Sequence, residues 1–337
     1  MTSLSRRHFA LGASAIALAP GAGNRTFAAA PEMRQFHNQT ADSPLHRRLT
    51  EMWAAVADET GGRIRVRVSA QNGNLPGADP QALRMLIAGE LEFYTLMGGI
   101  LGEIVPIADI QGMPFAFRDH AQVYRALDGD LGDLLRAEAA AKGIHVVPKA
   151  CFENGFRHIT TSARPIRTVD DLRGLKIRIP ASQVFADIFR SLGAEPVAIN
   201  SNRIYDAAKS GEIDGQENPL AVVDGFKLHE VQRYCSLTSH MWSGFNLLAN
   251  MSAWQRLPDD ARASIERNGA KFAALQRADN IALAARLQDE LARRGMIFNT
   301  ADVSGFRPLL ADFYRRWKDR FGARAWAMLE SHVGKLG

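Results

Sequence analysis

The chain has 337 residues, of which 46% are hydrophobic and 23% charged, which is ordinary for a globular protein with room for two domains. This composition argues against a largely disordered chain, and no run of about 18 apolar residues suggests a membrane span. The formal net charge is +5, but basic and acidic residues are interspersed, which argues against nucleic-acid binding.

Residues 1–30 have the order of a secretory signal peptide. Arg6 and Arg7 form a basic start, residues 9–19 are apolar, and the alanines at 28–30 suit a signal peptidase. The two arginines also resemble the twin-arginine export motif, which serves proteins that fold before export; a general export signal with two chance arginines is the alternative. Without the three basic residues of this segment, 38 basic and 36 acidic residues remain, a net charge of +2. We expect a periplasmic protein, with the cleavage bond left open.

Strand patterns alternate with helical patterns from residue 34 to about 250. Apolar residues at helical spacing from Leu45 to Val56 predict a helix that either Asp42 or Ser43 caps, with Pro44 in its first turn. A half-buried strand is predicted at 64–68, further strands at 91–97, 145–150, 176–179 and 195–199, and helices at 182–192 and 202–210. This alternation favours α/β layers with largely parallel sheets.

The C-terminal third has a different pattern. Residues 259–294 predict one long helix, or two helices with a break near Asn268 and Gly269, and aromatic residues every four positions from Phe313 predict a last helix. No linker divides the chain. Two domains without a linker indicate strands and helices that cross between them more than once, which makes a hinge.

Motifs for catalysis and metal binding are absent from the sequence. There is no His-Glu-x-x-His motif, no P-loop and no Gly-x-Ser-x-Gly elbow, and the histidines lack metal-ligand spacing. Cys151 and Cys235 are a poor zinc site, and we favour two buried free thiols over a disulfide. We therefore expect no enzyme, no metal and no cofactor.

Arg178 is the strongest candidate for ligand binding. Lys176 and Arg178 share one face of a strand that Pro180 ends. Ligands of open α/β folds bind beyond the carboxyl ends of strands, and a guanidinium there matches a carboxylate through two parallel hydrogen bonds. From the spacing alone, a solvent-facing or salt-bridged arginine is the alternative.

Arg157 and Asn218 are weaker candidates. Arg157 follows Gly155, which allows close backbone approach, and Asn218 precedes Pro219 in a loop where its amide can donate to a carboxylate. A structural arginine and a local cap are the alternatives.

Three segments together resemble the substrate-binding proteins of tripartite ATP-independent periplasmic (TRAP) transporters, the DctP-like family. They read Gly-Phe-Arg at 155–157, Asp-Leu-Arg-Gly-Leu-Lys-Ile-Arg-Ile-Pro at 171–180 and Asp-Gly-Gln-Glu-Asn-Pro at 214–219. The resemblance implies that Arg178 grips the ligand carboxylate. It further implies that Arg157 lines the same cleft and that Asn218 helps to place the carboxylate.

The resemblance suggests further contacts. Gln216 is expected to orient the arginines or to stabilise a turn. Trp242 and Phe245 are expected either in the cleft or in the core, and His37 and Asn38 end the first strand and are candidates for polar contacts from the first lobe.

The expected cleft lining predicts a ligand with few hydroxyl groups. Met97, Gly98, Gly99 and Ala181 are apolar or small, and buried hydroxyls there would lack hydrogen-bond partners. We therefore expect a small carboxylate rather than a nine-carbon sugar acid.

The resemblance implies an α/β, two-lobed periplasmic-binding-protein-like fold with crossing hinge strands and a long C-terminal helix. The first lobe is expected to hold residues 31–150 plus about 240–282. The second is expected to hold 154–238 plus about 283–330, with the C-terminal helices.

The expected function is capture of a small organic carboxylate outside the cytoplasm and delivery to the membrane subunits of a TRAP-type secondary transporter. We expect a monomer that binds no nucleic acid. A ligand-binding component of a periplasmic sensor and, less favoured, a twin-arginine-exported enzyme are the alternatives. The identity of the carboxylate stays open.

Overall fold

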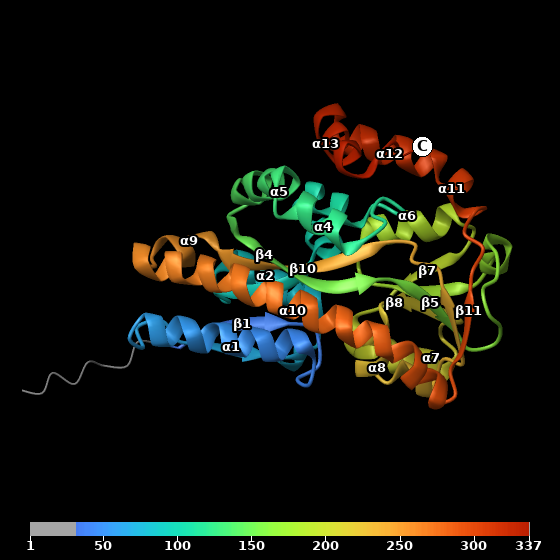
Figure 1. Cartoon of the computed structure of the whole chain (residues 1–337), viewed down its shortest axis with the longest axis horizontal. Helices are drawn as coiled ribbons and strands as arrows, with labels where there is room; N and C mark the ends of the chain where they lie inside the picture. The colour runs from blue at the N-terminus through green and yellow to red at the C-terminus, as the bar shows by residue number, and fades with distance from the viewer. Residues whose placement is uncertain (1–31, 337) are drawn as a thin grey trace, which may run out of the picture.

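The computed structural model describes residues 32–336, and the predicted signal segment 1–30 lies outside them. Two β-sheets flanked by helices form the two halves of an elongated molecule (Figure 1). The first sheet has five strands and the second has six. The predicted α/β class is confirmed.

The five-stranded sheet has the order β2-β1-β3-β10-β4. In that order its strands are Val66–Ser69, Met33–His37, Phe93–Met97, Trp242–Asn250 and Ile144–Phe156. β1 is parallel to β2 and β3, whereas β10 runs antiparallel to β3 and β4. The strand β10 therefore returns from the second half of the molecule to complete the first sheet.

The six-stranded sheet has the order β11-β9-β5-β8-β6-β7. In that order its strands are Ile297–Thr300, Tyr234–Leu237, His158–Thr161, Gly215–Asn218, Lys176–Ile179 and Glu195–Ala198. β5 runs antiparallel to β8 and β9, and the other pairs are parallel.

Both sheets are thus mixed, and the prediction of largely parallel sheets is wrong. The chain passes directly from β4 into β5 and from β9 into β10, each time entering the other sheet. The first passage carries the chain from the first sheet into the second, and the later passage carries it back. β10 therefore runs opposite to its neighbour β4, and β9 runs opposite to its neighbour β5.

Helices cover the outer faces of both sheets. They are α1 (Pro44–Glu59), α2 (Ala78–Ala88), α3 (Gly98–Leu101), α4 (His120–Leu127), α5 (Asp130–Ala140), α6 (Gln183–Ser191), α7 (Ile204–Ser210), α8 (Leu220–Gly225), α9 (Met251–Gln255), α10 (Asp259–Arg293), α11 (Phe306–Leu309), α12 (Ala311–Phe321) and α13 (Ala323–Val333). None of the helices within residues 32–336 is both long and apolar enough to cross a membrane.

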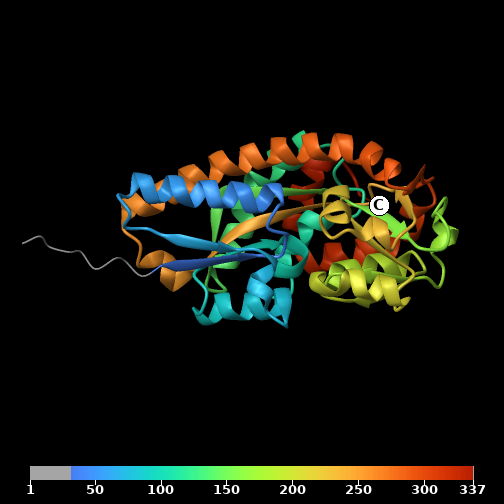
Figure 2. The same ribbon diagram turned by 90° about the horizontal axis from the view of Figure 1, so that it is seen from below.

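Helix α10 runs along both halves of the molecule (Figure 2). It continues through Asn268 and Gly269, so the single-helix alternative holds. Beyond it, β11 joins the second sheet, and the C-terminal helices α12 and α13 then return to pack near α4, α5 and α6. The two halves are therefore tied together by β4, β10, α10 and the C-terminal segment.

Helix α1 forms where its spacing predicts it. Of the two expected caps, the structure uses Ser43, whose side chain accepts a hydrogen bond from the backbone N–H of His46. Pro44 occupies the first turn, where its missing N–H costs nothing, and Leu49 and Met52 lie on the buried face.

Side chains of α10 bind the backbone of β4. Gln276 Oε1 accepts from the N–H of Glu153 at 2.7 Å, and its Nε2 donates to the carbonyl of Glu153 at 2.8 Å. Asn280 donates to the carbonyl of Asn154 at 2.9 Å. The register of β4 with β10 shifts here and leaves Asn154 without a cross-strand partner, so the helix supplies hydrogen bonds at this bulge.

Cys151 and Cys235 are free and buried, as the sequence favoured. Burial raises the pKa of each thiol to about 12, so both are inert at neutral pH.

The two bonds of Gln276 yield a stability prediction. Gln276→Met leaves the buried N–H and carbonyl of Glu153 without this partner, and each unpaired group costs about 1–3 kcal/mol. We expect urea unfolding to show a loss of that size. Gln288→Met, at an exposed site on the same helix, should leave the midpoint unchanged; equal effects of the two variants would contradict the role of Gln276.

Candidate functional site

A small cavity of about 30 Å³ lies between the two sheets. Pro180 lines it at the end of β6, Asn218 lies at the end of β8, and Asn38 follows β1, so strand ends of both sheets meet here. Eight of its fifteen lining residues are polar or charged: Asn38, Gln39, Asp79, Asn154, Arg157, Arg178, Ser201 and Asn218. Buried polar and charged groups from distant parts of the chain thus converge on one point.

Arg178 is buried on β6, with 3% of its surface exposed. Its Nε donates to the carbonyl of Ile199 at 2.7 Å, and among residues 32–336 the two terminal amino groups have no hydrogen-bond partner. Burial lowers the pKa of Arg178 to about 9, with the Glu217 carboxylate acting in the opposite direction. The residue is a buried cation whose fork faces the cavity with its donors free.

Arg157, between β4 and β5, uses its donors on the protein itself. Its Nε and Nη2 bond to the two carboxylate oxygens of Glu217 at 2.5 and 2.8 Å, and Nη2 also donates to Asn218 Oδ1 at 2.8 Å. Nη1 donates to Ser243 Oγ at 3.1 Å and lies 3.7 Å from the sulfur of Met97. This arginine joins β8 to β10 and has little capacity left for a ligand.

Gly155 lets β4 approach this ion pair closely. Its φ is +130°, and a Cβ there would lie 3.1 Å from Pro219. Any larger residue would be strained in this backbone conformation and crowded against the turn that carries Asn218.

Glu217 is a fully buried carboxylate held by two partners. Burial opposes its ionisation, but Arg157 and His240 outweigh burial and lower the pKa of Glu217 below its usual value. Burial lowers the pKa of His240, so that imidazole is neutral at pH 7. Because a carboxylate only accepts, Nε2 of His240 carries the proton toward Glu217 at 3.3 Å, and Nδ1 accepts from Thr238 at 2.8 Å.

Gln216 lies behind Asn218 and does not line the cavity. It accepts from Asn218 Nδ2 through its side-chain oxygen and donates to Thr160 Oγ1 at 2.7 Å. These bonds fix which way the Asn218 amide points, with Oδ1 toward Arg157. Gln216 thus positions Asn218.

Asp79 is a cavity residue that the sequence reasoning missed. Its Oδ1 accepts from Tyr94 at 2.7 Å and from Asn72 at 2.8 Å, and its Oδ2 accepts from Asn38 at 3.1 Å. Oδ2 keeps room for one more donor. The sequence does hold a signal for Asp79. It is an acidic residue directly before Pro80, at the start of a helix that comes after a strand.

The remaining predicted contacts divide into two groups. Asn38 and Phe245 line the cavity. His37 instead hydrogen-bonds with His46 at 2.9 Å, and Trp242 donates to Glu153 at 2.8 Å, so these two side chains lie outside the cavity lining.

The apolar lining expected from the sequence is not what the cavity has. Of the four residues on which it depended, only Met97 borders the cavity, whereas Gly98, Gly99 and Ala181 do not. The lining therefore gives no support to the prediction of a ligand with few hydroxyl groups.

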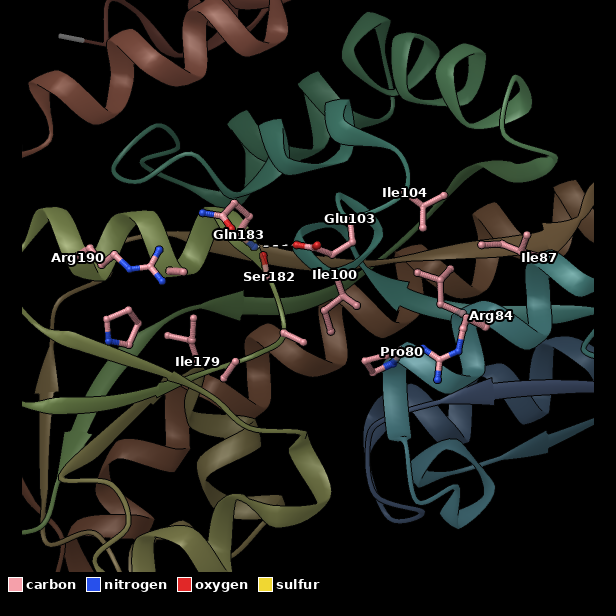
Figure 3. A pocket seen from close by; sticks show the side chains of 15 residues that line it. Pro80, Arg84, Ile87, Ile100, Glu103, Ile104, Ile179, Ser182, Gln183 and Arg190 are labelled. Carbon is pink, nitrogen blue, oxygen red and sulfur yellow. Dashed lines mark hydrogen bonds between the residues drawn. The ribbon is translucent and has the colours of Figure 1, made fainter.

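A larger groove of about 600 Å³ lies on the other side of the segment after β6 (Figure 3). Ile179 and Ala181 line the groove, whereas Arg178 and Pro180 line the small cavity, because successive residues of an extended chain point to opposite faces. We take the small cavity as the ligand site because the buried charges converge there. Within residues 32–336, no cluster of three or more potential metal ligands occurs.

A family model described as bacterial extracellular solute-binding protein, family 7 (DctP), matches residues 36–319. A solute-binding protein of Verminephrobacter eiseniae is 32% identical over 280 residues, which are 82% of each chain. Protein y4mM of Sinorhizobium fredii is 34% identical over 77% of this chain, but the match spans only 48% of that longer protein.

A third relative and one solved structure carry ligand names. The 2,3-diketo-L-gulonate-binding periplasmic protein YiaO of Escherichia coli is 34% identical over 65% of this chain and 62% of its own. The crystal structure of a TRAP periplasmic solute-binding protein from Polaromonas, bound to D-erythronate, is 28% identical with a TM-score of 0.83, and covers 89% of this chain and 98% of its own.

The buried ion pair yields a second stability prediction. Glu217→Gln leaves Arg157 charged without its carboxylate, and breaking a buried pair in this way costs about 3–5 kcal/mol of unfolding free energy. Glu212→Gln, which breaks an exposed pair with Arg203, should cost less than about 1 kcal/mol.

The pH dependence of this loss follows from the lowered pKa of Glu217. A carboxyl with a depressed folded pKa stabilises the protein above its unfolded pKa and loses that contribution as the pH falls through the folded value. The difference in the free energy of unfolding between wild type and Glu217→Gln, measured by urea, should therefore become smaller in acid. A difference that becomes larger in acid would contradict an ionised Glu217.

Proposed function

The chain belongs to family 7 of the bacterial extracellular solute-binding proteins, the DctP family of TRAP transporters, and from this premise we propose that it captures a small organic acid outside the cytoplasm. It delivers the acid to the membrane subunits of a TRAP-type secondary transporter. It acts as a monomer and makes or breaks no bond. The resemblance drawn from the three sequence segments is thereby confirmed at the level of the family.

The observation that carries the proposal is the free fork of Arg178. A buried guanidinium without an anion is unfavourable, and a carboxylate that accepts two parallel hydrogen bonds from it offsets that cost. Each charge-assisted bond contributes about 1.5–3 kcal/mol. Arg157 cannot take this role without giving up Glu217, so Arg178 is the anchor and Arg157 holds the cavity wall.

The chemistry opposite Arg178 favours a hydroxylated acid. Asp79 and Asn38 border the cavity from the first half of the molecule, and Asp79 Oδ2, which accepts from Asn38, has room for one more donor. A ligand hydroxyl suits that position, whereas a second carboxylate would face a like charge. The D-erythronate bound by the Polaromonas protein is a hydroxylated acid of this kind.

The two lobes close around this ligand. The first lobe comprises residues 31–150 plus about 240–282, and the second comprises 154–238 plus about 283–330. Arg178 belongs to the second lobe and Asp79 to the first, so one ligand that bonds to both stabilises the closed arrangement. The hinge consists of β4, β10, α10 and the C-terminal segment that also ties the two halves together.

Substitution of Arg178 tests the anchor. Arg178→Lys keeps the charge but loses the planar fork, and we expect titration calorimetry with D-erythronate to show at least tenfold weaker binding, the effect of about one lost charge-assisted bond. Arg178→Ala should bind at least a hundredfold more weakly while keeping the far-ultraviolet circular dichroism of the wild type. Wild-type affinity in a folded Ala variant would refute the role.

A ligand screen tests the substrate class. Thermal shifts should rank D-erythronate above succinate, because the second carboxylate of succinate meets Asp79. They should also rank it above N-acetylneuraminate, the largest of the three acids, which would force the strand ends around the cavity furthest apart. Asp79→Asn should weaken D-erythronate and improve succinate relative to it. A sialic acid that binds most tightly would contradict the proposed size and class.

Small-angle scattering tests closure. We expect a smaller radius of gyration for the protein saturated with D-erythronate than for the unliganded protein. An unchanged radius together with calorimetric binding would exclude the closure mechanism.

A further inference from the structure

The N-terminus of helix α6 is capped by a residue from the other lobe. The backbone N–H of Gln183 donates to Glu103 Oε1 at 2.9 Å, and 80 residues separate the two (Figure 3). Glu103 follows α3 in the first lobe, whereas α6 follows β6 in the second. A carboxylate at this position satisfies one of the free N–H groups of the helix and interacts favourably with its dipole.

The cap residue that the sequence itself provides is not used. Ser182 has the extended backbone of an N-cap, but its side chain makes no cap hydrogen bond. Its Oγ is buried without a hydrogen-bond partner among residues 32–336. It is turned toward Gly99 of the first lobe, where it would lie 3.2 Å from an added Cβ. Serine is among the best N-cap residues, so an idle, buried Ser182 needs an explanation.

We propose that helix α6 exchanges caps when the lobes move, with Glu103 capping it in the closed arrangement and Ser182 in the open one. The inference rests on the proposed closure of the lobes around a ligand. Opening separates Glu103 from Gln183 and frees Ser182 from Gly99, so its hydroxyl can turn back onto the first turn of α6. Because the helix stays capped in both arrangements, the lobes can part without leaving its N-terminus unsatisfied.

This exchange sits where it affects ligand affinity. Ser182 follows Arg178 by four residues, through Pro180, so the cap and the anchor share one segment. Phe185 on the first turn of α6 packs under Gly99, whose Cβ would lie 2.7 Å from the ring, and the same ring lies 5.0 Å from the guanidinium of Arg157. Glu103 is therefore a positioning residue, which acts on the ligand through α6.

The test compares two substitutions that are expected to have opposite effects on the binding of D-erythronate. Glu103→Ala removes the closed-state cap only, and the dissociation constant should rise about fivefold, the size of a lost helix cap. Ser182→Ala removes the open-state cap and the unpaired buried hydroxyl of the closed state, so the constant should fall about two- to fivefold. Ser182→Ala should also reduce the radius of gyration of the unliganded protein.

The controls separate this exchange from loss of fold and from failure of the proposed function. Glu138→Ala, at an exposed site on α5, changes the charge equally and should bind as the wild type does. Urea unfolding of unliganded Glu103→Ala should match the wild type, because the open form does not use Glu103.

Two results would overturn the cap exchange: an unchanged affinity of Glu103→Ala, or an unchanged or weaker affinity of Ser182→Ala. The proposed function would still stand in either case if Arg178→Ala loses binding. If the wild type binds no organic acid, the proposed function and the exchange both fall.

Discussion

One buried carboxylate governs the charge balance of the cavity. Two arginines reach the same buried region, and Glu217 is engaged by one of them, Arg157, through two hydrogen bonds. Burial makes an ionised carboxylate and an unpaired guanidinium both unfavourable, so the pairing of Glu217 with Arg157 leaves Arg178 as the cation that requires a partner. In the proposed function, the ligand carboxylate is that partner. The division of labour between the arginines thus follows from a single ion pair.

The same ion pair explains why the hinge region is built as it is. Arg157 sits where the chain passes from β4 to β5, and its bonds reach β8 and β10, so it ties the crossing strands together. Gln276 on α10 fixes the preceding bulge of β4, and Gln216 fixes the amide of Asn218. Neither of these neutral side chains lines the cavity. In the proposed function they hold the groups around the cavity in place, which reduces the ordering cost of binding.

The first half of the molecule contributes acceptors to the cavity, and the second half contributes a cation. Asp79, which accepts from a hydroxyl and two amides, lines the cavity together with Arg178. Glu103 accepts from the first N–H of α6, also between the two halves. The proposed contact of the ligand carboxylate with Arg178 and the contact of Glu103 with Gln183 are of the same kind. In each, a carboxylate accepts from N–H donors of the second half. In the proposed closure, a ligand that fits both lobes and a cap that bridges them stabilise one arrangement together.

The sequence by itself determined the family, the α/β class and the candidates Arg178, Arg157 and Asn218. For α10 it left two options, one long helix or two. Local periodicity and short motifs suffice for these because strand ends and turn residues have fixed geometric consequences. The tertiary structure alone decided which arginine is free, since that depends on Glu217, 60 residues from Arg157. It also decided that Asp79 lines the cavity while His37 and Trp242 do not, and that both sheets are mixed. These outcomes depend on how the chain crosses between two sheets, and no local pattern records which distant side chains such crossings bring together.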